Sequence, residues 1–225
     1  MPMRVLVGLF PLPPEVRLEV GDDSAWAGTV ESVRVAGKNL GSLDYVISPW
    51  KGLLGEMQYS VALDTGAGRI DAIVNRSLWT GTVKLRNVRG EVNAALFHDV
   101  LSANAVTRGQ VLVELDSIAL RRGEYIHAEG RGEWRNLVVE LGGGIRFGSV
   151  DFEVRPENAG TLVELASRDG ELLAAGSVFI DAEGGLESRI ELREGDALTA
   201  AGRSLLNLAG AVDDGGILKH AWQLF

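Results

Sequence analysis

Apolar and polar positions alternate along most of this chain. In the stretch 108–141, Val111, Val113 and Leu115 recur with a period of two, and the alternation resumes after a break at Arg122-Gly123. Successive side chains of a β-strand point to opposite faces, so this period predicts strand, turn and strand. The resulting sheet has one apolar face and one charged face.

The same period recurs before and after this stretch, separated by glycine-rich turns. The chain contains 29 glycines, most of them between apolar runs where a hairpin or bulge needs a positive φ. We therefore expect a mainly β protein, built as a meander of antiparallel hairpins. The predicted strands are 16–20, 26–35, 40–47, 56–64, 69–75, 78–88, 145–154, 161–167, 171–181, 186–193 and 217–224, with a bulge near Gly148.

Helical spacing predicts three short helices among these strands. Residues 91–101 and 196–208 have apolar positions three and four apart. Residues 48–55, SPWKGLLG, read as one helical turn. In that turn Ser48 is the predicted cap, Pro49 the first position and Gly55 the exit, with Trp50, Leu53 and Leu54 on the buried side.

The pattern predicts a single domain, 15–225, folded as a curved sheet or a sandwich. A strand, a helix and a strand follow one another twice, so we expect a weak internal duplication with halves 15–107 and 108–225. Four of the five tryptophans fall on predicted strands and are expected to anchor the core: Trp26, Trp79, Trp134 and Trp222.

The first residues stand apart from this pattern. Residues 3–12 are apolar except for Arg4, and Pro13-Pro14 would end any helix arriving from upstream. One interpretation is that 1–14 is a remnant linking to a missing N-terminal membrane anchor. The other is a first strand or an arm packed on the domain.

The composition excludes certain classes of partner and site. A net charge of -9 repels phosphates, so nucleic acid is not an expected partner. The chain has no cysteine, which excludes a disulfide framework and a thiolate metal site.

No pattern of catalytic residues stands out. His98, His127 and His220 lack metal-ligand spacing, and no serine nucleophile motif occurs. The acidic pairs Asp22-Asp23 and Asp213-Asp214 are typical of turns, and a glycosidase pair or calcium site built from them is a remote alternative. We therefore expect no enzymatic activity, no metal and no cofactor.

The predicted apolar face suggests a second use of the sheet. Two short helices cover only part of it, so a curved sheet offers a groove for an acyl chain or an apolar segment of a partner. The residues expected to line such a groove are Met57, Tyr59, Val61, Leu63, Val111, Val113 and Leu115.

Two blocks of sequence resemble a known family. The chain resembles the type II secretion system protein N family in 22–29, DDSAWAGT, and above all in 40–56, LGSLDYVISPWKGLLGE. Residues 85–92 and 130–136 add to the resemblance. Tyr45 is a departure, because many members carry tryptophan at this position. The residues that carry the resemblance are Trp26, Gly28, Leu43, Ser48, Pro49, Leu53, Leu54 and Gly55.

The resemblance implies an accessory or scaffold component of the machinery that exports folded proteins across the bacterial outer membrane. It implies an inner-membrane protein with its body in the periplasm, no assigned enzymatic activity, and other inner-membrane or periplasmic secretion proteins as partners. Because the chain is acidic, we expect such a partner to carry a basic patch. A lipid-binding or lipid-transfer module is the alternative.

Overall fold

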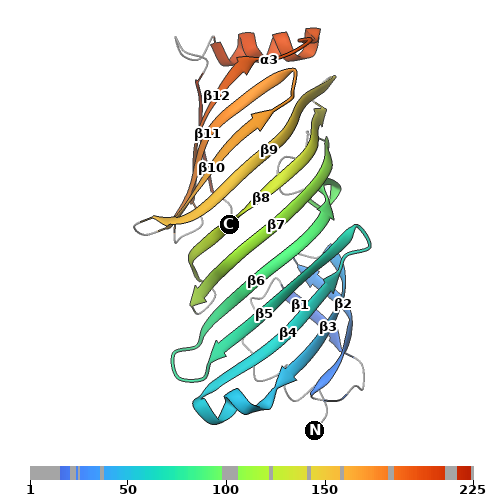
Figure 1. The fold of residues 1–225 in the computed structure, drawn as a ribbon, viewed down its shortest axis with the longest axis vertical. Coiled ribbons are helices and arrows are strands. Elements are labelled where there is room, and N and C mark those ends of the chain that lie inside the picture. Colours follow the sequence, from blue (N-terminus) through green and yellow to red (C-terminus); the bar gives the residue numbers. More distant parts are fainter. Residues whose placement is uncertain are drawn as a thin grey trace.

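The chain folds into one long antiparallel sheet. The computed structural model describes residues 16–20, 24, 26–35, 38–97, 106–121, 124–140, 143–157, 160–181, 185–210 and 217–223. In this part of the chain thirteen strands pair in their sequence order, each with the next one (Figure 1). The predicted meander is thus confirmed, and of the two predicted architectures the structure has the single curved sheet.

The strands lie side by side along the long axis of the molecule, with β1 and β2 turned behind the sheet at one end (Figure 1). The first six are β1 (Val16–Val20), β2 (Ala27–Val35), β3 (Lys38–Ser48), β4 (Glu56–Asp64), β5 (Gly68–Ser77) and β6 (Thr82–Asn93). The others are β7 (Val106–Arg121), β8 (Glu124–Glu140), β9 (Gly144–Glu157), β10 (Gly160–Arg168), β11 (Leu172–Asp181), β12 (Gly185–Glu194) and β13 (Ile217–Gln223).

Three strands in the middle of the sheet are the longest, with 16, 17 and 14 residues in β7, β8 and β9. At about 3.4 Å per residue, a strand of this length spans roughly 50 Å. Their pairing is interrupted by bulges. The register of β8 against β9 shifts where Leu137 pairs with Gly148, so the bulge predicted near Gly148 is confirmed.

Two of the predicted helical segments differ from the structure in their limits. Residues 91–93 belong to β6, and only Ala94–Phe97 forms a 3-10 helix, η2. The prediction of a helix over 91–101 is therefore wrong in its first part, because Val92 continues the period-two burial of the strand; residues 98–101 lie outside the described part. The second helix, α3 (Ala200–Gly210), begins four residues later than predicted.

The third predicted helical turn is present as a 3-10 helix, η1 (Pro49–Leu54), which ends at Gly55 in the left-handed conformation. Ser48 occupies the cap position, but its side chain makes no capping hydrogen bond. Trp50 was predicted on the buried side of this turn and is instead exposed. The side chains of Leu53 and Leu54 lie outside the described part.

A further correction concerns 78–88, where residues 78–80 form a turn and β6 starts only at Thr82. Trp79 is accordingly exposed, and so is Trp26, against the prediction that both anchor the core. Trp79 lies in the turn between β5 and β6, where the alternation of strand faces does not apply, and its indole lies beside Gly55. Trp134 is partly buried, and the side chain of Trp222 lies outside the described part.

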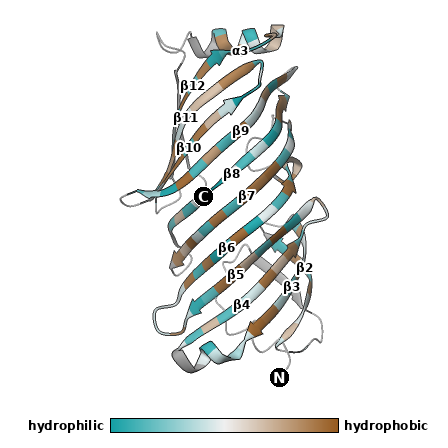
Figure 2. Cartoon of the chain, in the orientation of Figure 1, coloured by the Kyte–Doolittle hydropathy of each residue, from teal (hydrophilic) through white to brown (hydrophobic). Residues whose placement is uncertain are grey.

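The two faces of the sheet differ in chemistry, as the alternation predicts, and apolar and polar positions alternate along the strands in Figure 2. We call one face the apolar face. Its cross-strand row from β4 to β10 consists of Leu63, Ile70, Gly90, Val113, Gly132, Phe152 and Leu165.

Glycine has a specific use in this row. A Cβ on Gly132 would collide with the ring of Phe152 and the carbonyl oxygen of Leu112, so only glycine lets the Phe152 ring lie against the backbone of β8.

Hydrophobic side chains of the apolar face gather in three clusters. The first, around Val30, Tyr45 and Tyr59, lies on β2 to β5. The second joins Val92 and Val111 with η2 in the middle of the sheet. In the third, Leu205 and Leu206 of α3 pack on Ala174 and Leu192. The two helical segments η2 and α3 therefore lie against the apolar face.

A buried carboxylate fixes the start of α3. Glu171 has no exposed surface, and its carboxylate accepts hydrogen bonds from the N–H of Arg146 at 2.9 Å and the N–H of Thr199 at 3.3 Å. The hydroxyl of Thr199 in turn accepts from the N–H of Gly202 at 3.2 Å and caps the helix. These bonds connect β9, the turn before β11 and the N-terminus of α3.

Candidate interaction surfaces of the sheet

The other face, which we call the charged face, carries a row of ionic side chains opposite one another on six neighbouring strands. Because pairs in adjacent strands stand about 5 Å apart, opposite charges along such a row stabilise the register. From β5 to β10 the row reads Asp71, Arg89, Glu114, Arg131, Glu153 and Glu164. The first five members alternate in sign, whereas Glu153 and Glu164 form a like-charged pair.

Several members of this face form ion pairs. Arg131 contacts Glu114 at 3.0 Å, and Arg155 contacts Glu164 at 2.8 Å. All four side chains are at least 46% exposed, so each pair contributes about 0–1 kcal/mol to stability. Their main effect is to specify which face of each strand meets solvent.

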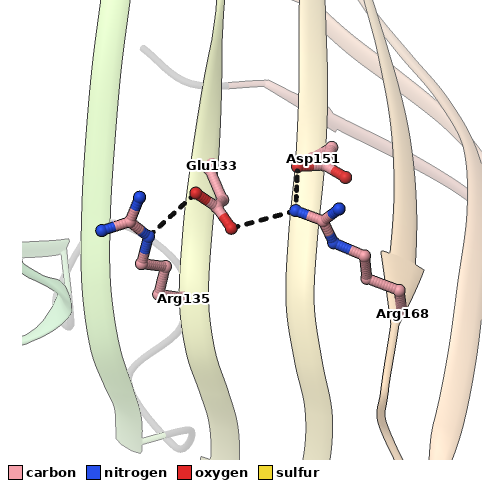
Figure 3. A network of polar contacts seen from close by, with 4 residues as sticks. All are labelled: Glu133, Arg135, Asp151 and Arg168. Carbon is pink, nitrogen blue, oxygen red and sulfur yellow. Dashed lines mark hydrogen bonds and ion pairs between the residues drawn. The ribbon is translucent and has the colours of Figure 1, made fainter.

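A four-residue network crosses strands β8 to β10 on the same face (Figure 3). Glu133 accepts hydrogen bonds from Arg135 at 2.9 Å and from Arg168 at 3.1 Å, and Arg168 also donates to Asp151 at 3.1 Å. The hydrogen bond from Arg135, helped by that from Arg168, lowers the pKa of Glu133, although partial desolvation opposes the shift. Glu133 therefore stays ionised at a lower pH than an ordinary glutamate.

Two hollows occupy the charged face. The larger, of about 870 Å³, lies over β6 to β10, and the smaller, of about 630 Å³, lies over β3 to β6. Asn87 and Arg89 line both hollows, so the two meet at β6. Asn87 has a positive φ of 50° and sits at the bulge of β6 against β5.

The larger hollow has an acidic lining, with six carboxylates and three arginines. Arg131 and Arg155 are engaged by Glu114 and Glu164. The exposed carboxylates of Asp116, Glu129 and Glu153 have no ion-pair partner among the described residues. Arg89 has no ion-pair partner among the described residues either, so six carboxylates against three arginines leave the lining with three excess negative charges.

The residues predicted to line a groove all lie on the apolar face, because Leu63 is linked through Ile70 and Gly90 to Val113 by the strand register. Tyr59 is buried in the first cluster, and the side chains of Met57, Val61 and Leu63 pack against that cluster. Val111 and Val113 belong to the second cluster. Leu115 is half-buried on β7.

Tyr59 shows how apolar the first cluster is. Burial raises its pKa to about 12, although nearby Arg76 lowers it.

The residues that carry the family resemblance gather at one end of β2 and β3. Gly28 pairs with Tyr45, whose hydroxyl donates to the carbonyl of Ser24 at 2.7 Å. Leu43 packs on the first cluster, and Ser48, Pro49 and Gly55 bound η1. A Cβ on Gly55 would collide with the indole of Trp79, so this glycine lets the β5–β6 turn approach η1.

The candidate chemical groups are not brought together in the part of the chain that the structure describes. His127 lies on β8, and no group of three metal-ligating side chains occurs among the described residues. His98 and the pairs Asp22-Asp23 and Asp213-Asp214 lie outside the described part, as does the side chain of His220.

Sequence reasoning missed the residues that shape the charged face. The alternation on each strand shows that Glu114 or Glu153 points to the charged side, but which strand meets which depends on register. The buried Glu171 was also missed, because its carboxylate finds its backbone partners only when α3 folds back on the sheet.

Comparison with known proteins assigns the family. The family model described as type II secretion system (T2SS), protein N, matches residues 18–220. No curated protein and no solved structure matches the chain. In the described residues, no helix has the length and hydrophobicity needed to cross a membrane. Because the family model extends over nearly all thirteen strands, the chain belongs to the type II secretion system protein N family.

Proposed function

We propose that this protein is a non-enzymatic scaffold of the type II secretion machinery, with its body in the periplasm and an N-terminal anchor in the inner membrane to which residues 1–14 link. Membership of the family supports a role in secretion. The acidic hollow on the charged face supports the scaffold role, because it offers a contact surface to a basic segment of another secretion component.

The sheet suits this role physically. Its backbone is held in hydrogen-bonded strands, so a binding partner needs to order only the acidic side chains and not the backbone beneath them. Asp116, Glu129 and Glu153 attract a basic partner over a distance of about 8–10 Å at physiological salt. Anchoring both partners in one membrane raises their local concentration, so weak contacts suffice.

Photo-crosslinking in bacteria that carry the secretion system tests this proposal. A photoreactive residue at position 129 is expected to cross-link to another inner-membrane or periplasmic secretion component. The triple variant D116N/E129Q/E153Q, captured from the same cells by a tag, should recover about tenfold less of that component, and wild-type recovery should fall as salt is added.

A matched control neutralises three exposed acids outside the hollows: Asp169, Glu187 and Glu194. It removes the same net charge and should leave capture and secretion unchanged. Equal loss in both triple variants, or recovery that does not respond to salt, would contradict a specific acidic contact.

The apolar face supports a second candidate function, the binding of a lipid or another apolar ligand. The seven predicted groove residues share that face, and in the described part of the chain only η2 and α3 among the helical segments lie against it. Native mass spectrometry of protein purified without detergent should then find a bound lipid. The bulky substitution Val61→Trp should reduce its occupancy, whereas Ala62→Trp, on the opposite face of the same strand β4, should not.

A further inference from the structure

Large exposed apolar side chains gather at one end of the sheet. Among the described residues, the five most exposed ones are 53–86% exposed. They are Trp26, Val46, Trp50, Leu78 and Trp79.

Backbone contacts place these residues together. The N–H of Ile47, next to Val46, donates to the carbonyl of Trp26 at 2.7 Å, and the N–H of Leu78 donates to the carbonyl of Gly55 at the end of η1 at 2.9 Å. The β5–β6 turn and η1 lie next to each other at the lower end in Figure 1, and α3 lies at the upper end. We call the lower end, formed by 26, 46–56 and 75–86, the tip.

The tip also carries positive charge, in contrast to the whole chain. A hollow of about 290 Å³ is lined by Lys51, Lys84 and Arg86, with Glu56 as its one acidic residue. None of the three cations has an ion-pair partner among the described residues. The hollow is thus basic on a chain of net charge -9.

Hydroxyl and amide groups complete this hollow. Ser77, Thr80 and Thr82 line it, and the hydroxyl of Thr80 donates to that of Thr82 at 2.9 Å. The side-chain oxygen of Asn75 is buried there without a hydrogen-bond donor. A ligand with phosphate oxygens for the cations and a hydroxyl for Asn75 matches this set of groups.

We propose that the tip docks on a membrane surface that contains anionic phospholipid. Tryptophan rings suit the interface between headgroups and acyl chains, because the ring is apolar while its N–H still finds a polar partner. Lysine and arginine near the surface are attracted to anionic headgroups. The exposed indoles insert at the headgroup level, and the basic hollow binds a headgroup phosphate. This inference is independent of the acidic contact proposed above.

Vesicle flotation tests the proposal with the full chain. Vesicles that contain phosphatidylglycerol and phosphatidylcholine should bind the protein at low salt, and vesicles of phosphatidylcholine alone should bind it much more weakly. Because each cation contributes about fivefold to binding, the triple variant K51Q/K84Q/R86Q should lose on the order of 100-fold in affinity. Trp50→Ser and Trp79→Ser should each lose about tenfold.

Two control variants alter equivalent groups far from the tip. Val106→Ser removes an exposed apolar side chain at the start of β7, and Arg203→Gln removes an exposed cation of α3. Both should bind vesicles like the wild type. Brominated phosphatidylglycerol should quench tryptophan fluorescence in the wild type and much less in the double variant W50S/W79S, and thermal melting checks that each variant is folded.

Several outcomes would overturn the proposal: no binding to phosphatidylglycerol vesicles, equal losses in the control variants, or capture of a protein partner by the tip in the absence of any vesicle binding. None of these results bears on the acidic contact, which is tested through Asp116, Glu129 and Glu153.

Discussion

The two ends of the sheet are built differently. At the end of α3, Leu205 and Leu206 of the helix pack on the sheet. The buried carboxylate of Glu171 accepts hydrogen bonds from the N–H of Arg146 on β9 and the N–H of Thr199 just before α3. At the tip, η1 is a 3-10 helix of six residues and leaves Trp50 and Trp79 exposed. The buried carboxylate near α3 thus has hydrogen-bond donors, whereas at the tip the side-chain oxygen of Asn75 has none and two indoles are exposed.

This difference separates stability from interaction. A buried polar group with all its partners contributes to folding, and its loss exposes the full cost of unpaired donors. An exposed aromatic ring contributes little to folding and is available to another surface. We therefore expect substitutions at the α3 end to reduce stability, and substitutions at the tip to reduce binding.

The largest effect is expected at Glu171. The substitution Glu171→Ala leaves the N–H groups of Arg146 and Thr199 without an acceptor, at about 1–3 kcal/mol each. Urea unfolding should show a loss of about 2–6 kcal/mol, and amide hydrogen exchange in α3 should speed up. Glu171→Gln keeps one acceptor oxygen and should lose less. Unchanged exchange in α3 would contradict the anchoring role.

Gly55 at the tip should show a smaller effect. Its φ of 75° disfavours other residues, and a Cβ would collide with the indole of Trp79. Gly55→Ala should cost about 1–3 kcal/mol in urea unfolding.

Gly66→Ala is the matched control for Gly55, because Gly66 has a similar φ of 67° and open space around its Cβ position. It isolates the cost of the backbone conformation. Adding Trp79→Ala to Gly55→Ala should recover the part of the loss that is due to the collision. No recovery would show that the indole does not constrain η1.

The exposed tryptophans should hardly affect stability. Trp50→Ser and Trp79→Ser are each expected to change the unfolding free energy by less than about 0.5 kcal/mol. The reference for comparison is Leu172→Ala on β11, where the side chain is fully buried and the expected loss is about 2–5 kcal/mol. A loss of similar size in Trp50→Ser would contradict the expectation that substitutions at the tip leave stability unchanged.

The smallest effect concerns the charged face between the ends. The pKa of Glu133 is lowered mainly by Arg135, so Arg135→Gln should raise it more than Arg168→Gln does in an NMR titration. A lowered pKa means that the stabilisation is present above the ordinary value of 4.5 and is lost as the pH falls below it. Equal shifts in the two variants would contradict the order of the two contacts.

Alternation along the chain determined much of this protein. Period two at Val111, Val113 and Leu115 is enough to predict long strands with one apolar face, and sequential hairpins follow from the turns. The family, too, is readable from the block 40–56, because it lies on one continuous strand and turn. The N-terminal anchor, the internal duplication and the groove stay predictions.

Only the tertiary structure decided how the residues meet. Local sequence cannot show that β6 starts at Thr82, because a tight turn at 78–80 exposes Trp79 despite its strand-like pattern. Local sequence also cannot show that Lys51, Lys84 and Arg86 line one hollow, because Lys51 belongs to η1 and the other two belong to β6. The physical reason is that alternation fixes the face of a side chain, while register and turn geometry fix its neighbours.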